Sequence, residues 1–329
     1  MKDSIGVGIV GYGAMYSMGK HHSAEVQGTD GMELRAIYDV ISERRAAARE
    51  EQPGVTVYDT NEDLLADESV DLVVLVTPHN THCALSVQAS QADKHVMTEK
   101  VMCLNVAEAD EMIKAADDVG RLLTVYQNRR WDGDFLTVQN VLLSGKLGKV
   151  FQIESCVNGF YFPDGWRGVR ECGGGMLYDW GAHLCDQICT LMRPAVPVSV
   201  YAISHAGAHG VDIETQTTAM IKFDNGVSAE IDVGCMSHIS RPRWLIRGEK
   251  GAFVMPDWQT ATLKTADGET EVEVEPANWH AIYQNVADHL TKESPLAVSA
   301  QDVRSAMQVI DAAFASADTG EVARIGGTN

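Results

Sequence analysis

The sequence predicts a doubly wound α/β domain with a parallel sheet, followed by an α+β domain with a mostly antiparallel, open-faced sheet. Three observations indicate this. An apolar segment at the start runs into a glycine turn, β-type and helical segments then alternate as far as residue 126, and beyond it β-type segments follow one another. Alternation is typical of parallel sheets, and successive strands are typical of antiparallel ones. The 329 residues suit about two domains, which we place at residues 1–126 and 127–329.

The first forty residues have the order that a dinucleotide-binding unit requires. A strand over 5–10 leads into a glycine turn, and a second strand over 32–38 ends at an aspartate. The first glycine allows a sharp turn, the second allows close approach to a pyrophosphate, and the next helix offers free N–H groups. The aspartate can accept hydrogen bonds from ribose hydroxyls. The residues expected here to bind the cofactor are Gly11, Gly13, Ala14, Met15 and Asp39.

The alternation then continues to residue 126. Strands are expected over 55–58, 72–76, 95–98 and 122–126, with helices over 81–92 and 106–119. The segment 72–76 is apolar throughout, as expected for a strand covered on both faces. These segments complete the predicted parallel sheet.

The second part has a different rhythm. Helices are expected over 135–143 and 176–191, and Val303, Met307, Ile310 and Phe314 lie at helical spacing near the end. Strands are expected over 149–160, 198–204, 215–223, 227–235, 243–247, 252–255 and 260–265. Asp224-Asn225-Gly226 is typical of a hairpin turn between two of them. This pattern predicts the mostly antiparallel sheet.

Charge and composition narrow the possible functions. The formal net charge is −20, which disfavours a nucleic-acid partner because proteins neutralise phosphates with clustered Lys and Arg. No apolar run approaches the roughly 20 residues of a membrane span, and the start of the chain does not read as a signal peptide. We expect a cytoplasmic protein without membrane contact. The seven cysteines lack zinc-site spacing, so we expect reduced thiols and no metal.

Polar residues follow two of the predicted parallel strands directly. They are Thr77, Pro78, His79 and His82 after one strand, and Glu99 and Lys100 after the next. Ligands of such sheets bind beyond the carboxyl ends of the strands, so we expect these side chains around the cofactor. The alternative for His82 is packing on the sheet, and for Lys100 it is simple surface exposure.

A second cluster lies on the predicted helix 176–191. Asp179 and His183 are four residues apart, and Asp186 is three residues further on, so all three fall on one helical face. A histidine with a carboxylate one turn away can act as a general base. The alternative is a helix-surface pair without a catalytic role.

Taken together, these motifs resemble those of the oxidoreductase family that includes glucose-fructose oxidoreductase, inositol dehydrogenases and MocA. The resemblance covers nearly the whole chain. Its marks are Gly8-Ile9-Val10-Gly11-Tyr12-Gly13, Asp39, Thr77-Pro78 with His82, Glu99-Lys100, Asn128-Arg129-Arg130, Trp166-Arg167, and three glycines before Asp179 and His183.

The resemblance implies a Rossmann domain that holds NAD or NADP and a second domain that binds the substrate. Lys100 would hydrogen-bond the reacting hydroxyl, His183 would take its proton, and Asp179 would orient that pair or the substrate. Asn128, Trp166 and Arg167 would approach the cofactor. Tyr161 and Trp166 lie in an aromatic loop that suits a sugar or cyclitol ring, although such loops also form small satellite cores.

Two positions depart from the family pattern. Tyr16 stands where the glycine fingerprint has a third small residue, which predicts looser helix packing or another loop path. Val101 replaces the proline of the family's Glu-Lys-Pro motif. Because a cis bond before a non-proline residue costs about 2.5–4 kcal/mol, we expect the Lys100–Val101 peptide to be trans.

We predict an NAD-dependent dehydrogenase that acts on a secondary alcohol of a sugar, glycoside or cyclitol. Asp39 would repel a 2′-phosphate and so favours NAD, whereas Arg44 and Arg45 could accommodate NADP if they do not simply form a solvated helix face. Two alternatives remain: a redox-neutral glycoside lyase or hydrolase that works through a transient keto-sugar, and a non-catalytic NAD sensor. The open second sheet predicts a homo-oligomer, either a dimer or a tetramer.

Overall fold

The computed structural model describes residues 4–13, 17–207 and 210–326. The chain forms two compact units: Met1–Gln127 with His280–Val303, and Asn128–Trp279 with Arg304–Asn329. The predicted fold classes of both parts are confirmed, and the strands pair into one parallel and one mostly antiparallel sheet. Residues 280–303, which lie between two stretches of the second unit in sequence, group with the first unit.

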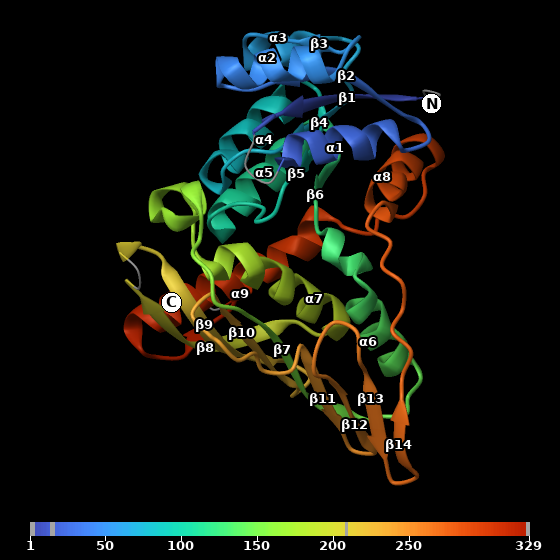
Figure 1. The fold of residues 1–329 in the computed structure, drawn as a ribbon, viewed down its shortest axis with the longest axis vertical. Helices are drawn as coiled ribbons and strands as arrows, with labels where there is room; N and C mark the ends of the chain where they lie inside the picture. The colour runs from blue at the N-terminus through green and yellow to red at the C-terminus, as the bar shows by residue number, and fades with distance from the viewer. Residues whose placement is uncertain (1–3, 14–16, 208–209, 327–329) are drawn as a thin grey trace. The chain divides into compact units, whose positions relative to one another are not determined.

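The first sheet has the doubly wound order β3-β2-β1-β4-β5-β6 (Figure 1). Its strands are β1 (Ile5–Val10), β2 (Met32–Tyr38), β3 (Thr56–Val57), β4 (Leu72–Leu75), β5 (His95–Thr98) and β6 (Leu123–Val125). All pairs are parallel, and β1 lies between β2 and β4, where the strand order reverses. In sheets of this kind the ligand crevice opens at that reversal, beyond the carboxyl ends of the strands.

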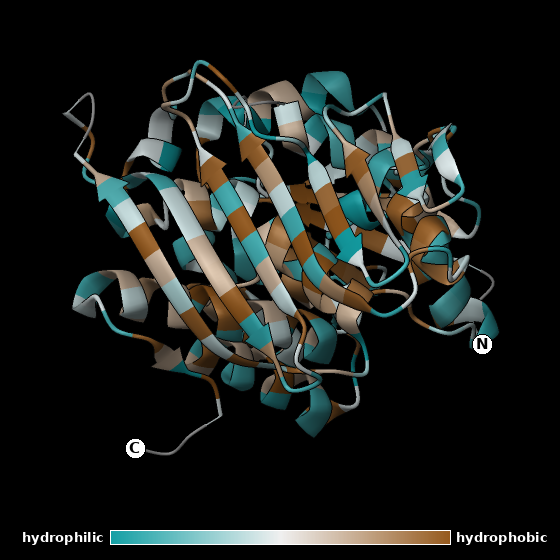
Figure 2. Cartoon of the chain, turned by 90° about the horizontal axis from the view of Figure 1, so that it is seen from below, coloured by the Kyte–Doolittle hydropathy of each residue, from teal (hydrophilic) through white to brown (hydrophobic). Residues whose placement is uncertain are grey.

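The second sheet has the order β14-β13-β12-β11-β7-β10-β9-β8-β15. Its strands are β7 (Val150–Asn158), β8 (Pro197–Ala206), β9 (Glu214–Phe223), β10 (Ser228–Gly234), β11 (Trp244–Gly248), β12 (Gly251–Met255), β13 (Thr262–Thr265), β14 (Gly268–Glu271) and β15 (Ala323–Arg324). Only β7 and β10 pair in parallel among these described strands. Figure 2 shows the open face of this sheet, with hydrophilic and hydrophobic residues alternating along its strands.

The helices are α1 (Met18–Gln27), α2 (Ser42–Glu51), α3 (Asn61–Ala66), α4 (His82–Gln91), α5 (Val106–Val119), α6 (Gly133–Leu143), α7 (Ala182–Met192), α8 (Ala281–Lys292) and α9 (Ala300–Thr319). Local chemistry explains their ends. The Asn105 side chain caps α5 by accepting from the Glu108 N–H at 2.9 Å, and Gly120 ends the helix in the left-handed region. In the second unit α7 and α9 cover one face of the sheet (Figure 1), and the Ala202 N–H donates to Ser316 Oγ of α9.

Contacts made by α8 explain why residues 280–303 belong to the first unit. The Tyr283 hydroxyl lies 2.6 Å from Nδ1 of the buried His22 in α1, and His280 Nδ1 lies 2.7 Å from the Glu25 carboxylate. Thr124 of β6 also donates to the carbonyl of Val298. Sequence order alone does not reveal these pairings, because the partners are more than 170 residues apart.

A buried ion pair fixes the start of the second unit. Arg130 donates to both oxygens of Asp186, from Nε at 2.7 Å and from Nη2 at 2.6 Å, and both side chains are almost fully buried. The sequence predicts Asp186 on one helical face with Asp179 and His183. Its carboxylate instead pairs with Arg130, which lies in the segment before α6. The helix also begins as a π-helical turn, Leu177–Gly181, so the simple α-helical spacing does not hold there.

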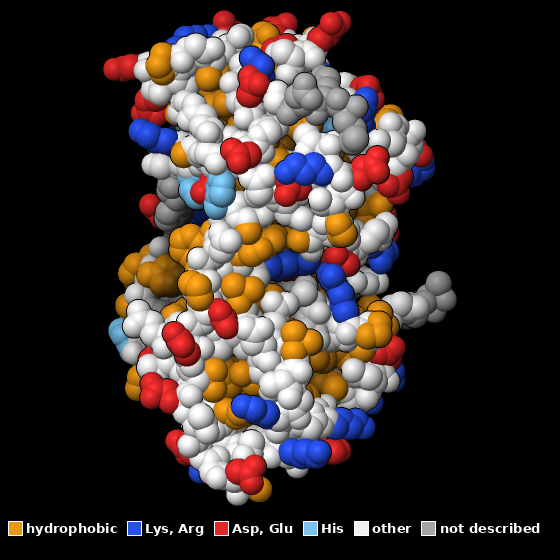
Figure 3. Space-filling view, turned by 90° about the vertical axis from the view of Figure 1, so that its right-hand side faces the viewer, with side chains coloured by type: hydrophobic (Ala, Val, Ile, Leu, Met, Phe, Trp, Pro, Cys, Tyr) orange, Lys and Arg blue, Asp and Glu red, His pale blue; other side chains and the backbone are white. Residues whose placement is uncertain are grey.

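The face shown in Figure 3 carries acidic and basic side chains interspersed, and no continuous basic area is visible on it. Within residues 4–13, 17–207 and 210–326, no helix has the length and apolar composition needed to span a bilayer.

Replacing Asp186 by Ala tests the buried pair. The variant leaves the Arg130 guanidinium buried without its carboxylate, so we expect the free energy of unfolding to fall by about 3–5 kcal/mol. Urea denaturation followed by circular dichroism measures it. Glu269→Ala, which removes the partner of Lys264 in an exposed pair of the same unit, is the control and should leave the midpoint unchanged. Equal effects of the two variants would contradict the assignment.

Candidate active site

The glycine turn after β1 depends on close backbone approach. Gly11 has φ of 101°, and a Cβ built on it would lie 2.1 Å from the Val76 carbonyl oxygen. Gly19 of α1 is equally constrained, because its Cβ would lie 2.6 Å from Tyr12 Cα. Gly19 therefore allows the close helix packing that a third fingerprint glycine provides, and we did not identify it from the sequence. Ala14, Met15 and Tyr16 lie outside the described residues.

Asp39 ends β2 as predicted and is buried. Its Oδ2 accepts the Tyr12 N–H at 2.6 Å, and its Oδ1 accepts the Ile41 N–H at 2.8 Å. The carboxylate thus ties the glycine turn to the start of α2. Each oxygen keeps a second lone pair, so the group can still accept a bond from a ribose hydroxyl.

Arg44 lies against the glycine turn. A Cβ on Gly13 would meet Arg44 Nη1 at 2.8 Å, and this nitrogen is buried with no hydrogen-bond partner within residues 4–13, 17–207 and 210–326. The expectation of a fully solvated helix face is therefore wrong for Arg44. Arg45 is engaged differently, since it donates to the Asp39 carbonyl and to Asp59. A buried guanidinium N–H without an acceptor suits an anionic ligand.

The loops after β4 and β5 are held together by His82. Its Nδ1 lies 2.8 Å from the Val101 carbonyl and its Nε2 lies 3.0 Å from the Thr77 carbonyl. Burial lowers the pKa of His82, so at neutral pH the ring donates to only one of them. The His79 ring packs edge-on against the His82 ring, and the two ring centres are 5.7 Å apart. These contacts fit the packing role considered from the sequence; cofactor contact by His82 stays a prediction.

The Lys100–Val101 peptide bond is cis, so the expected trans bond is wrong. The physical reason lies in tertiary contacts, which a dipeptide preference does not include. The Val101 side chain is almost fully buried, and its carbonyl faces His82. The segment after β5 is thus held both by packing of the Val101 side chain and by the contact of the Val101 carbonyl with His82.

Glu99 positions the backbone of Lys100. Its Oε2 accepts the Lys100 N–H at 2.9 Å, and its Oε1 lies 2.9 Å from Nε2 of His22. Burial alone would raise the pKa of Glu99, but the hydrogen bond with His22 and the nearby charges of His22 and Lys100 outweigh it, and the pKa is lowered. Glu99 is therefore a carboxylate at neutral pH.

In the second unit, glycines allow the segment before α7 to pack tightly. A Cβ on Gly174 would lie 2.4 Å from the Arg167 carbonyl oxygen, and one on Gly175 would lie 2.2 Å from Glu214 Oε1. Gly175 also has φ of 120°. The three-glycine run therefore brings the Trp166–Arg167 turn and Glu214 against the helix start that carries Asp179 and His183.

Several predicted site residues meet in this unit. Arg167 Nε lies 3.6 Å from the Asp179 carboxylate, and its guanidinium lies 4.6 Å from the Trp166 ring centre. His183 is buried. The Tyr161 hydroxyl contacts Met176 Sδ at 3.6 Å, next to the glycine run. Asn128 lies in the turn Asn128–Trp131 before α6, and no contact described here joins it to this group.

Glu214 is a buried acid beside this helix that the sequence analysis missed. It is 4% exposed, and its Oε1 accepts the Leu177 N–H at 2.9 Å. Burial raises the pKa of Glu214 to about 7, although the Leu177 N–H and the charge of Arg170 oppose this. The carboxyl therefore titrates closer to neutral pH than an ordinary Glu. A single Glu at a strand start carries no sequence signal for this role.

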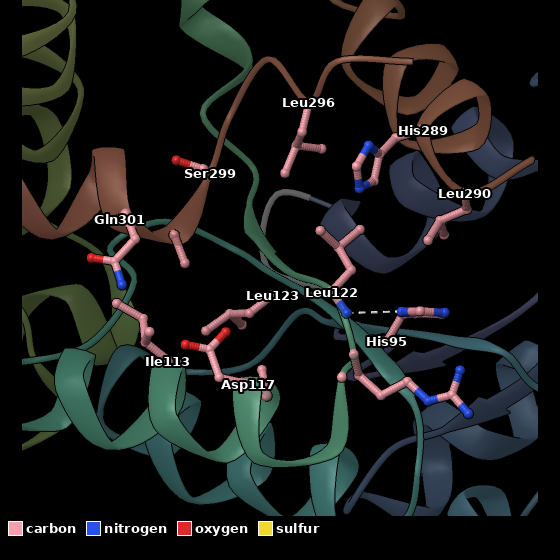
Figure 4. Close-up of a pocket in the computed structure, with 14 residues that line it drawn as sticks. His95, Ile113, Asp117, Leu122, Leu123, His289, Leu290, Leu296, Ser299 and Gln301 are labelled. Carbon is pink, nitrogen blue, oxygen red and sulfur yellow. Dashed lines mark hydrogen bonds between the residues drawn. The ribbon is translucent and has the colours of Figure 1, made fainter. Parts of the chain in front are cut away.

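A pocket of about 430 Å³ opens elsewhere in the first unit (Figure 4). It lies at the amino ends of β5 and β6, whereas the predicted cofactor residues follow the carboxyl ends of the strands. His95 lines it and accepts the Leu122 N–H at 2.9 Å, and burial lowers the pKa of His95 to about 4. Apolar side chains such as Leu290 and Leu296 form much of its wall. The pocket is therefore separate from the candidate cofactor residues.

Replacing Glu214 by Gln tests its protonation. The unfolded carboxyl titrates near 4.5 and the folded one near 7, so the folded state holds the proton more tightly and stability is lost as the pH rises between these values. Glu214→Gln should exceed wild type in unfolding free energy by up to about 3 kcal/mol at pH 8 and match it at pH 4.5. Urea titrations across this range measure it, with the exposed Glu273→Gln as control. A constant difference at all pH values would contradict the assignment.

Comparison with known proteins adds independent evidence. Residues 5–127 match the model of the oxidoreductase family with an NAD-binding Rossmann fold, and residues 135–254 match the GFO/IDH/MocA C-terminal domain. The uncharacterized oxidoreductase YdgJ of Escherichia coli (strain K12) is 30% identical over 96% of this chain and 97% of its own length. The NADP(+) scyllo-inositol 2-dehydrogenase IolW of Bacillus subtilis (strain 168) is 27% identical over 95% and 94%.

The solved structures agree. An NAD-binding protein from Listeria innocua matches with a TM-score of 0.89 and 31% identity, over 99% of this chain and 98% of that one. Both halves of the fold and almost the full length are therefore shared with known relatives. The chain belongs to the GFO/IDH/MocA family of oxidoreductases, with a Rossmann domain that binds NAD(P).

Proposed function

We propose that this protein oxidises a secondary alcohol of a sugar, glycoside or cyclitol and passes the hydride to NAD. The observation that carries the proposal is the buried His22–Glu99 pair, which fixes the Lys100 backbone directly after β5. A lysine whose backbone is fixed in this way is suited to contact a ligand, whereas a surface lysine does not need such a fixed backbone. The relative IolW, named for its action on scyllo-inositol, supports the substrate class.

The residues of the first unit fit a dinucleotide. Gly11 lets the turn after β1 pack against the Val76 carbonyl, Asp39 keeps acceptor capacity, and Arg44 has a buried N–H without a partner among the described residues. We assign cofactor contact to these residues, to the segments Thr77–His79 and Glu99–Lys100, and to Asn128, Trp166 and Arg167. When bound at these residues, NAD would supply the hydride acceptor for oxidation of the carbinol carbon.

The chain's own groups then handle the proton. Lys100 donates a hydrogen bond to the reacting hydroxyl and stabilises the negative charge that develops on its oxygen. His183 accepts the hydroxyl proton, and Asp179 orients this pair or the substrate. Tyr161 and Trp166 contribute apolar surface for the substrate ring. Under this assignment Arg167, which pairs with Asp179, orients that carboxylate.

His183→Ala tests the proton acceptor. We expect turnover in NAD-linked alcohol oxidation to fall about 100-fold or more, because positioned general bases contribute that much. The wild-type rate should also fall at acid pH as the imidazole becomes protonated, and the variant should lose this dependence. NADH absorbance measures both. His205→Ala, an exposed histidine on β8, is the control. A variant with the wild-type pH profile would rule out the assignment.

The choice between NAD and NADP rests on two opposed groups. Asp39 disfavours a 2′-phosphate, and we propose NAD for this reason, while Arg44 offers it a charged donor. Arg44→Ala should raise KM for NADP about tenfold or more and change KM for NAD little, as expected for a lost charge-assisted hydrogen bond. Asp39→Ser should reduce the preference for NAD. Arg49→Ala, on the same helix and paired with Asp59, is the control. If the ratio of KM for NAD to KM for NADP is unchanged in both variants, both roles are refuted.

The redox-neutral alternative uses the same residues and differs in its products. A screen of sugars, inositols and glycosides with NAD and with NADP, read by nicotinamide absorbance and product analysis together, separates the two functions. NADH that accumulates with an unsubstituted polyol supports the dehydrogenase. Cleavage of a glycoside without net cofactor change supports the lyase or hydrolase instead.

We also propose a homo-oligomer, in a cytoplasmic setting, that pairs through the open face of the second sheet. Tyr201, Ile203 and Met220 expose apolar side chains there, and Tyr201 and Met220 are direct neighbours in the sheet. Apolar side chains grouped on a strand face are typical of association surfaces. A monomeric mass by light scattering would contradict this part of the proposal.

A further inference from the structure

A row of aromatic rings runs from His183 to the loop between β12 and β13. The Trp180 ring lies edge-on to the His183 ring, with centres 6.0 Å apart, and the Trp258 ring centre also lies 6.0 Å from that of Trp180. All three belong to the second unit. Trp258 is thus two ring steps from the proposed proton acceptor, a separation that a disaccharide can bridge.

Trp258 packs against neighbouring side chains and is still partly exposed. The guanidinium carbon of Arg243 lies 4.6 Å from its ring centre, and Arg243 is 2% exposed, whereas Trp258 is 41% exposed. The guanidinium carbon of Arg129 lies 5.9 Å from the same ring centre, so the exposed part of the indole is what remains for a ligand to cover. Exposure of this kind costs free energy in the absence of a ligand.

The cations beside these rings are already paired. Arg129 lies 4.2 Å from the Trp180 ring centre and donates to Asp132 at 2.8 Å, and Arg243 Nε lies 2.9 Å from Asp134. Because each guanidinium has a carboxylate partner, this row does not call for an anionic ligand. A neutral occupant is favoured.

The loop that carries Trp258 is held in place. Asp257 Oδ1 accepts the N–H groups of Gln259 at 2.8 Å and Thr260 at 2.7 Å, and also the Thr260 hydroxyl at 2.9 Å. A loop ordered in advance loses little conformational freedom when a ligand binds. The indole is therefore presented in a fixed position.

We propose that Trp258 is the platform for a second, neutral sugar ring of a glycoside whose first ring reacts at His183. The C–H groups of a pyranose carry partial positive charge and pack on the electron-rich face of an indole, while the hydroxyls at the ring edge remain in water. This inference rests on the proposed function, because it takes His183 as the reacting end. It narrows the substrate class from any polyol to a glycoside of at least two rings.

Steady-state kinetics with matched substrates test the subsite. NAD reduction is measured for glucose, galactose and mannose and for the disaccharides cellobiose, maltose, lactose, melibiose and mannobiose. We expect at least one disaccharide to have a KM below that of its parent sugar. Trp258→Ala should raise that KM about tenfold, equivalent to roughly 1.4 kcal/mol, and leave the KM of the monosaccharide unchanged.

Two conservative variants separate stacking from simple cover over Arg243. Trp258→Phe keeps an aromatic face and should retain most of the preference, whereas Trp258→Leu covers Arg243 equally well and should lose it. Phe151→Ala removes another exposed aromatic of the same unit and should change neither KM. Thermal unfolding of each variant shows that it is folded. Equal behaviour of the Leu and Phe variants would overturn the stacking role.

Calorimetric binding of the same disaccharides provides a readout that does not need turnover. If neither these sugars nor the inositols of the screen reduce NAD, the proposed function fails, but disaccharide binding that is lost in Trp258→Leu still supports the platform. If monosaccharides reduce NAD and no disaccharide binds better than its parent, the proposed function stands and the platform is refuted.

Discussion

The buried carboxylate of Glu99 is the constraint on which the chemistry of the first unit depends. One of its oxygens holds the Lys100 N–H and the other holds His22, whose second nitrogen contacts Tyr283. A buried charge is costly unless its partner is present, so these side chains must assemble together. These contacts join the end of β5 to helices α1 and α8. Together they fix the backbone position of the proposed catalytic lysine.

In the second unit, glycines position the helix start that carries the proposed catalytic residues. Gly174 and Gly175 remove side chains so that backbone and the Glu214 carboxylate can approach the helix start directly. Glu214 then accepts the Leu177 N–H within the π-helical turn that carries Asp179. Burial of this carboxyl weakens its acidity, so its charge near neutral pH depends on the packing around it. The helix start that carries Asp179 is therefore held by a carboxyl group whose charge changes near neutral pH.

Local patterns predicted the regular elements well. The strands 5–10, 32–38 and 95–98 and the helix 106–119 have the predicted bounds, because apolar runs and caps act over neighbouring residues. Helix α8 was missed, since its contacts with His22 and Glu25 come from residues far away in the sequence. The cis Lys100–Val101 bond has the same origin, because burial and the His82 contact lie outside the reach of a dipeptide rule.

By itself, the sequence determined the two fold classes, the family and the identity of most candidate side chains, because glycine turns, strand ends and helical spacing are local. Only the tertiary structure decided which of those side chains are already committed to others. It paired Asp186 with Arg130, engaged both ring nitrogens of His82 and set Trp258 over Arg243. It also left Arg44 Nη1 without a partner in the part of the chain that the structure describes. The physical reason is that burial and pairing depend on distance in space, which the order of residues does not contain.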